Sequence, residues 1–248
     1  MLFDPVTLFF LAVIVVCAYS VFGITGFGAA MVAVPISSHF VPLTVIVPVI
    51  LLTDLVATLT VGLKNWRKLN IIELLRIAPL MLVGIALGVL ALQEFSASFM
   101  LFALGIFVVL HSAWGLYKKD TPDTAISSNW AYVAGTLGGI FGAAFGTGGP
   151  IYTIYLMRRI SDAEVLRTTM AVVIFISGIL RLVVFGVFGV YANDDLYMLA
   201  LILVPFCLLG VLIGSKLRYK ISHQSLRKLM LQLLLIGGIS VIFRSQMI

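Results

Sequence analysis

The sequence predicts an all-α integral membrane protein, a polytopic helical bundle that forms a single domain over residues 1–248. Three observations carry this prediction. Apolar residues make up 62% of the chain and charged residues only 10%, whereas about a quarter of the residues of a soluble domain are charged. The apolar residues gather in runs of about 20, the length that crosses roughly 30 Å of hydrocarbon. The alternating segments of about 10 residues that a membrane β-barrel needs are absent from the sequence, so the crossings are expected to be helices.

The first half of the chain begins with an interrupted apolar stretch. Residues 5–22 are apolar, the string GITGFG follows at 23–28, and the stretch then resumes to residue 40. Three uninterrupted runs come next, at residues 43–63, 72–92 and 95–117. Each of the three is long enough to cross the bilayer as one helix.

The second half repeats this order after a polar stretch, KKDTPDTAISSN at residues 118–129, which is the candidate linker. An interrupted apolar stretch covers residues 130–157 and is broken by GTGGP at 146–150. Long apolar runs follow at 165–190, 196–215 and 226–243. We therefore expect two similar halves, one over residues 1–120 and the other over residues 129–248.

A repeated spacing of proline and glycine supports an internal duplication. The pattern P-x4-G-x3-G occurs once in each half, and a Thr-Gly pair recurs at each break. The alternative is that both residues are simply frequent in membrane helices. The glycines of the P-x4-G-x3-G pattern match the small-xxx-small spacing of packed membrane helices, so we expect them to be structural; they are Gly84 and Gly88 in the first half and Gly210 and Gly214 in the second.

The distribution of charge favours inverted halves. A basic cluster follows the first long run at residues 64–68, whereas the second half carries its cluster one connection later, at residues 216–228. If both interrupted stretches are re-entrant hairpins, every basic cluster faces the cytoplasm, as the positive-inside rule requires. Three crossings per half then make the halves inverted repeats, which is typical of transporters. The other possibility is that each interrupted stretch is one long tilted crossing.

The two glycine-rich breaks are the predicted substrate site. Neither has the context of a nucleotide-binding loop. Glycine frees the backbone and proline suits the first turn of a restarting helix, so the break exposes N–H groups that bind anions. Irregular backbone at membrane depth lines a cavity or is buried in protein. The predicted substrate-binding residues at the breaks are Gly23, Thr25, Gly26, Gly28, Gly146, Thr147, Gly148, Gly149 and Pro150.

Ionisable residues deep in the apolar runs are the other candidates, because a charge at the bilayer centre costs about 2.5–3.5 kcal/mol on insertion scales. Asp54 and Arg181 lie at similar depth and could meet, either as a structural pair or with Arg181 as an anion ligand and Asp54 as a gating or coupling carboxylate. His111 could relay protons, or simply pack. The arginines near the helix ends are expected to snorkel to the interface: Arg76, Arg158, Arg159 and Arg167.

Several classes of function are disfavoured by what the sequence lacks. It contains no metal-spaced His/Cys cluster and no G-x-S-x-G motif, so we expect no catalytic residues, no metal and no cofactor. The basic residues lie in short connections between apolar runs, where they are expected to set the orientation of the chain in the membrane. No nucleic-acid partner is therefore expected. Cys17 and Cys207 are in apolar runs and are expected to pack as reduced thiols.

The segments FGITGFGAAMVAVPI, at residues 22–36, and FGAAFGTGGPIYTIYL, at residues 141–156, resemble the sulfite exporter TauE/SafE family of membrane permeases. The likeness spans essentially the whole chain. The resemblance implies a multi-pass protein of the inner membrane that transports small sulfur-containing anions, such as sulfite or organosulfonates, or related organic anions. It does not indicate the direction of transport.

Together these observations predict a secondary transporter for a small anion, coupled to protons or another ion, whose partners are its substrate and the lipid bilayer. A passive anion channel is the first alternative and a membrane-embedded enzyme the second. The sequence does not indicate the oligomeric state.

Overall fold

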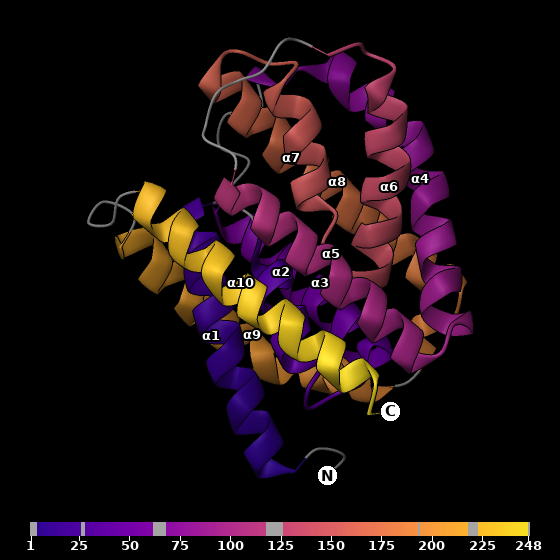
Figure 1. The fold of residues 1–248 in the computed structure, drawn as a ribbon, viewed down its shortest axis with the longest axis vertical. Coiled ribbons are helices and arrows are strands. Elements are labelled where there is room, and N and C mark those ends of the chain that lie inside the picture. The colour runs from indigo at the N-terminus through magenta and orange to yellow at the C-terminus, as the bar shows by residue number, and fades with distance from the viewer. Residues whose placement is uncertain are drawn as a thin grey trace.

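The computed structural model describes residues 4–25, 28–61, 68–117, 126–192, 194–217 and 223–247, and every regular element in these ranges is helical (Figure 1). A short 3₁₀ turn, Val190–Ala192, separates α8 from α9. The helices are α1 (Pro5–Thr25), α2 (Ala29–Ser37), α3 (Leu43–Val61), α4 (Ile71–Glu94), α5 (Ala97–Tyr117), α6 (Trp130–Phe145), α7 (Gly149–Met157), α8 (Ala163–Val187), α9 (Asp194–Leu217) and α10 (His223–Ser245).

Within the described ranges, six helices are long and apolar enough to cross a membrane: α1, α3, α4, α5, α8 and α9. Between 33% and 50% of each apolar window is buried inside the protein. The rest of each window presents large apolar side chains outward, among them Leu201 on α9 and Val183 on α8. An apolar outer surface of this extent is the surface of a protein solvated by lipid. The chain is therefore a polytopic helical membrane protein.

Glycines let α4 and α6 pack with their backbones in contact. A Cβ atom built on Gly84 would lie 2.2 Å from the carbonyl oxygen of Thr136, and one on Gly88 would lie 2.5 Å from that of Ile140. Only glycine fits at such distances, so the expected packing role of these two residues is confirmed. Because the contact advances in the same direction along both helices, α4 and α6 run parallel.

The same arrangement joins α9 to α1. A Cβ on Gly210 would lie 2.6 Å from the carbonyl oxygen of Val16, and one on Gly214 would lie 2.0 Å from that of Ser20. Here too the expected packing role is confirmed, and the two helices run parallel. The glycine pattern of each half therefore packs against the first helix of the other half.

Helix α8 lies alongside α4 in the same direction. At one end the ammonium of Lys68 forms an ion pair of 2.6 Å with Glu164, and at the other end the amide of Gln93 donates to the carbonyl oxygen of Phe188 at 3.2 Å. Helix α9 follows α8 closely in the chain, and the ring of Tyr191, between the two helices, lies 5.5 Å from the ring of Tyr197 on α9. Helix α9 therefore runs antiparallel to α4.

Helices α5 and α10 pair across the front of the molecule in Figure 1. A Cβ on Gly105 of α5 would lie 2.9 Å from the carbonyl oxygen of Gly238, while the Ser98 hydroxyl, near the start of α5, donates to the carbonyl oxygen of Ser245 at the end of α10. The contact runs backward along α10 as it advances along α5, so these helices are antiparallel.

Both α6–α7 and α1–α2 turn back on themselves. The guanidinium of Arg159, just after α7, donates at 3.0 Å to the carbonyl oxygen of Ile126, just before α6. In the first half, the ring of Phe40, just after α2, stacks 5.2 Å from the ring of Phe10, near the start of α1. The second arm of each unit thus returns toward the end at which the first arm began.

The two ends of the bundle differ in charge. The helix directions place Glu94 and Asp195 at one end, which we call the acidic end, together with Asp4. Lys68 and Lys216 lie at the opposite, basic end. Arg244, in the last turn of α10, is an exception, because α10 ends at the acidic end.

Candidate functional site

The break in the second half is a left-handed turn between two helices. Helix α6 ends at Phe145, and Gly146 has φ +72°, which favours glycine. The Gly146 N–H bonds the carbonyl oxygen of Gly142 at 2.9 Å. Helix α7 restarts at Gly149 with Pro150 in its first turn. The first N–H groups of a helix have no intrahelical partner, so this end of α7 is electropositive.

The first half turns at the equivalent place. Helix α1 ends at Thr25 and α2 begins at Ala29, after Gly28 with φ +91°. The Thr25 side chain, Gly26 and Phe27 lie outside the residues that the structure describes.

A cavity of about 40 Å³ lies where the two breaks meet. Helices α3 and α8 complete its wall. Of the described residues that line it, one has a positively charged side chain, Arg181, and one a carboxylate, Asp54. The lining residues from the two breaks are Gly28, Ala29, Ala30, Met31, Gly146, Thr147, Gly148, Gly149, Pro150 and Tyr152; the others are Phe22, Asp54, Thr58, Gly142, Ile174, Ser177 and Arg181.

Arg181 is held at the C-terminal end of α6. Its side chain is 5% exposed, and it donates from Nη1 to the carbonyl oxygen of Gly142 at 2.9 Å and from Nε to that of Ser177 at 3.3 Å. A cation at the end of a helix interacts favourably with the helix dipole, which helps to stabilise this buried guanidinium. No described residue accepts a hydrogen bond from its remaining nitrogen, Nη2.

Asp54 faces the same cavity but is bound to a different group. The hydroxyl of Tyr19, a completely buried residue, donates to Asp54 Oδ1 at 2.7 Å and also lies 2.7 Å from the hydroxyl of Thr53. Among the described residues, no contact of 4 Å or less joins the Asp54 carboxylate to the Arg181 guanidinium. The two residues share one cavity wall without forming an ion pair.

Three of the predicted site residues have surroundings that the sequence did not indicate. Gly23 is inside α1, where a Cβ would lie 2.6 Å from the carbonyl oxygen of Val211 on α9. A Cβ on Gly148 would lie 2.3 Å from the carbonyl oxygen of Gly138, inside the α6–α7 hairpin. The hydroxyl of Thr147, which is 1% exposed, lies 3.4 Å from the carbonyl oxygen of Phe141 and donates to it.

His111 does not line the cavity. It lies on α5, where its ring stacks on Phe107 at 6.2 Å, and the ring of Phe107 in turn contacts Phe141 of α6 at 4.3 Å. The aromatic contacts thus link His111 to α6 through Phe107.

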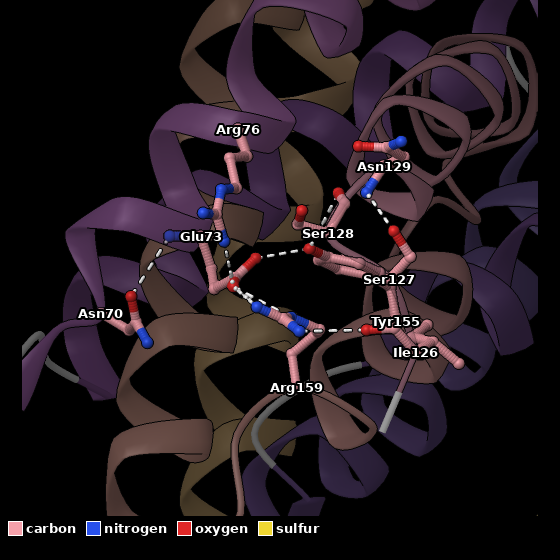
Figure 2. Close-up of polar contacts among 9 residues, drawn as sticks. All are labelled: Asn70, Glu73, Arg76, Ile126, Ser127, Ser128, Asn129, Tyr155 and Arg159. Atoms are coloured by element: carbon pink, nitrogen blue, oxygen red, sulfur yellow. Dashed lines mark hydrogen bonds and ion pairs between the residues drawn. The ribbon is translucent and has the colours of Figure 1, made fainter. Parts of the chain in front are cut away.

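A polar cluster at the basic end was not predicted. Glu73, on the first turn of α4, is 3% exposed and forms ion pairs with Arg76 at 2.8 Å and Arg159 at 3.0 Å (Figure 2). The hydroxyl of Tyr155 donates to its other oxygen. We call Glu73, Arg76, Tyr155 and Arg159 the Glu73 cluster. Arg76 and Arg159, which are expected to snorkel, both pair with this buried carboxylate and stay partly exposed. The only local signal was the Glu73–Arg76 spacing of three residues, which places both on one helix face.

The fold and the cavity define a class, a polytopic helical membrane protein with a small cavity between two helix breaks, lined by one arginine and one aspartate among the described residues. The chain belongs to the sulfite exporter TauE/SafE family, whose model matches residues 11–241. It is 25% identical over 193 residues to a protein of Comamonas testosteroni described as "Probable inner membrane transporter protein TsaS", covering 77% of this chain and 80% of that protein. No solved structure matches the chain. The family and this relative support a membrane transporter, in agreement with the resemblance seen in the sequence.

Proposed function

We propose that this protein is a secondary transporter that moves a small sulfur-containing or organic anion, such as sulfite or an organosulfonate, across the inner membrane. The observation that carries the proposal is the single cavity in which both breaks, Arg181 and Asp54 meet. The inner-membrane location is supported by the Comamonas relative, which is described as an inner membrane transporter.

The cavity offers an anion two kinds of positive potential. The N-terminal end of α7 contributes about half an elementary charge, and the N–H groups of Gly148 and Gly149 precede the first intrahelical bond. The guanidinium of Arg181, which also lines the cavity, adds a full charge, and its Nη2 group has no acceptor among the described residues. A planar guanidinium suits the oxygens of a sulfite or sulfonate group better than a point charge does.

Asp54 is the group through which we propose that protons are coupled to transport. An anion that enters next to a carboxylate repels its negative charge, so anion binding favours the protonated form of Asp54. The titratable or charged groups that face Asp54 are the Tyr19 hydroxyl on α1, the Cys207 thiol on α9 and Arg181 on α8. The Tyr19 hydroxyl can donate to the ionised carboxylate or accept from the protonated one.

We further propose that the two halves are inverted repeats and that their broken segments are re-entrant. The helix directions support this. Helix α6 runs parallel to α4, α9 runs antiparallel to α4, and α1 runs parallel to α9, so α6 runs opposite to α1, its counterpart. The mutual packing of α4 on α6 and α9 on α1 is also the exchange that a two-fold pseudosymmetry requires.

Proteoliposome flux tests the proposed function. Purified protein should accumulate labelled sulfite or a labelled organosulfonate with saturable kinetics, and an imposed pH gradient should change the initial rate. Flux that rises without saturation would indicate a channel, and chemical conversion without accumulation would indicate an enzyme. Either result would overturn the proposal.

Cysteine labelling tests the proposed inversion. In a chain without Cys17 and Cys207, cysteines at Ser127 and His223 should react from the cytoplasmic side and a cysteine at Met247 from the outside. Residues 127 and 223 on opposite faces would contradict the re-entrant arrangement. The sequence also predicts that Asn65 faces the cytoplasm and that Asn193 faces outward. Both residues lie outside the described residues.

A further inference from the structure

The Glu73 cluster forms one continuous network around a buried carboxylate. Oε1 of Glu73 accepts from Nη1 of Arg76 at 2.8 Å and from Nε and Nη2 of Arg159 at 3.1 and 3.0 Å. Oε2 accepts from the Tyr155 hydroxyl. The hydrogen bond to Glu73 raises the pKa of Arg159. The Glu73 N–H also donates to the side-chain oxygen of Asn70 at 3.2 Å, so Asn70 caps the start of α4. Figure 2 shows the side chains of Arg76, Arg159 and Tyr155 around the Glu73 carboxylate.

The network fastens both arms of the α6–α7 hairpin to α4. Tyr155 is on α7 and Arg159 lies just after it. Arg159 also donates from Nη1 to the carbonyl oxygen of Ile126, just before α6. The Tyr155 hydroxyl lies 3.5 Å from the backbone carbonyl oxygen of Ser128. The hairpin therefore cannot move away from α4 at the basic end unless these bonds break.

The other end of α7 is part of the cavity wall. Gly149, Pro150 and Tyr152 line the cavity, and Tyr155 follows Tyr152 by less than one turn. A helix of nine residues is about 13 Å long, so α7 extends from the cavity to the Glu73 cluster as one short rigid rod. Movement at the cluster would be transmitted directly to the cavity wall.

The fastening at the acidic end has different chemistry. There the α1–α2 hairpin is joined to α10 by the His39 ring nitrogen, 3.2 Å from the Ser240 hydroxyl, and the Phe10 and Phe40 rings stack. Among the described residues around this turn, no carboxylate–guanidinium pair replaces the Glu73 contacts. The side-chain contacts that fasten the two hairpins at the ends of the bundle thus differ in chemistry.

A buried ion pair is a weak source of net stability, because desolvation offsets most of the Coulomb attraction, but removing one partner is strongly unfavourable. Such a pair suits an element that has two discrete positions. We propose that the Glu73 cluster is a latch that holds α7 against α4 and keeps the cavity closed toward the basic end, and that its opening admits or releases the anion on that side. This inference rests on the proposed transport function. In it Glu73 is a positioning residue that acts through α7.

The test measures access to the cavity without any substrate. Thr58 lines the cavity and is half-buried, so Thr58→Cys in a Cys17→Ala, Cys207→Ala chain serves as the reporter. Inverted and right-side-out vesicles are treated with a membrane-impermeant maleimide. Glu73→Gln should raise the labelling rate from the basic end at least about tenfold, the factor that 1.4 kcal/mol gives, and should leave the rate from the acidic end unchanged.

Glu164→Gln is the matched control. Glu164 also forms an ion pair, 2.6 Å from Lys68, at the same end of the bundle, but its side chain is 50% exposed. Exposed pairs contribute little, so its labelling rate should equal that of the parent. Equal rates in Glu73→Gln and the parent would overturn the latch, as would an equal rise from both ends, which indicates general loosening.

If Glu73→Gln does not accumulate in the membrane, Tyr155→Phe and Arg159→Gln each remove one partner and keep the carboxylate. Both should raise the labelling rate from the basic end, and parental rates in both would refute the latch. Sulfite flux measured on the same vesicles separates the two proposals. Unchanged labelling with normal flux removes only the latch, whereas changed labelling without saturable flux of any tested anion removes only the transport function.

Discussion

Replacing Arg181 by alanine should weaken anion binding far more than it weakens the fold. In this variant the carbonyl oxygen of Gly142 still accepts the hydrogen bond from the Gly146 N–H at 2.9 Å. The carbonyl oxygen of Ser177 lies inside α8 and still accepts a backbone hydrogen bond within that helix. No backbone acceptor is left without a donor, so the effect on stability is expected to be small. An anion in the cavity, by contrast, loses a charge-assisted hydrogen bond worth about 1.5–3 kcal/mol, which corresponds to a roughly 10- to 150-fold rise in Kd.

The assay is the thermal shift that sulfite or an organosulfonate produces in the purified protein. Arg181→Ala should lose the shift, and Arg181→Lys should regain it only in part, because an ammonium keeps the charge but not the planar fork. Arg244→Ala, an arginine at the acidic end away from the cavity, should behave as the parent. The reasoning fails if the double variant Asp54→Asn, Arg181→Ala binds the anion as tightly as the parent, since Arg181 would then only balance the charge of Asp54.

The remaining predictions concern coupling, packing and capping. Asp54→Asn should preserve the substrate-induced thermal shift but abolish the response of flux to a pH gradient; a normal response would exclude Asp54 as the coupling group. Gly214→Ala should lower the melting temperature, because its Cβ would lie 2.0 Å from the carbonyl oxygen of Ser20, whereas Gly237→Ala, with nothing within 4 Å, should not; equal melting temperatures would contradict the packing. Hydrogen bonds from the first N–H groups of α8 lower the pKa of its N-cap residue Asp162, so its stabilisation is present above the unfolded pKa of about 4 and is lost as pH falls below it. Asp162→Ala should therefore be less heat-stable than the parent at pH 6, and the difference should shrink as the pH is lowered from 4 through the lowered folded-state pKa of Asp162; a difference that stays constant over this range would count against the cap.

The structure also changes what the Gly148 substitution can report. If Gly148 only lined the cavity, Gly148→Leu would block transport while the protein still assembled. Because the missing Cβ faces the carbonyl oxygen of Gly138 at 2.3 Å, a leucine would instead force α6 and α7 apart. We therefore expect Gly148→Leu to lose thermal stability as well as transport. A cavity-filling test is better made at Ser177, which lines the cavity.

The sequence by itself determined the membrane class, the helical fold and the family. These follow from local properties, because the length of an apolar run and the glycines that interrupt it act within one or two helical turns. The packing role of Gly84, Gly88, Gly210 and Gly214 also follows from local spacing, although their partners do not. Asp54 and Arg181 attracted attention because a charge in an apolar run is costly wherever it lies.

Only the tertiary structure decided what these side chains touch. Asp54 could have formed an ion pair with Arg181, but Tyr19 of α1 holds the carboxylate and the end of α6 holds the guanidinium. Glu73 and Arg159 are 86 residues apart, and the sequence around each indicates only a charged residue near a helix end. The α6–α7 hairpin brings Arg159 Nη2 to 3.0 Å from Glu73 Oε1. Which side chains meet depends on the helix directions and on the close contacts between glycines of one helix and the backbone of another. The local sequence around either residue does not indicate its partner.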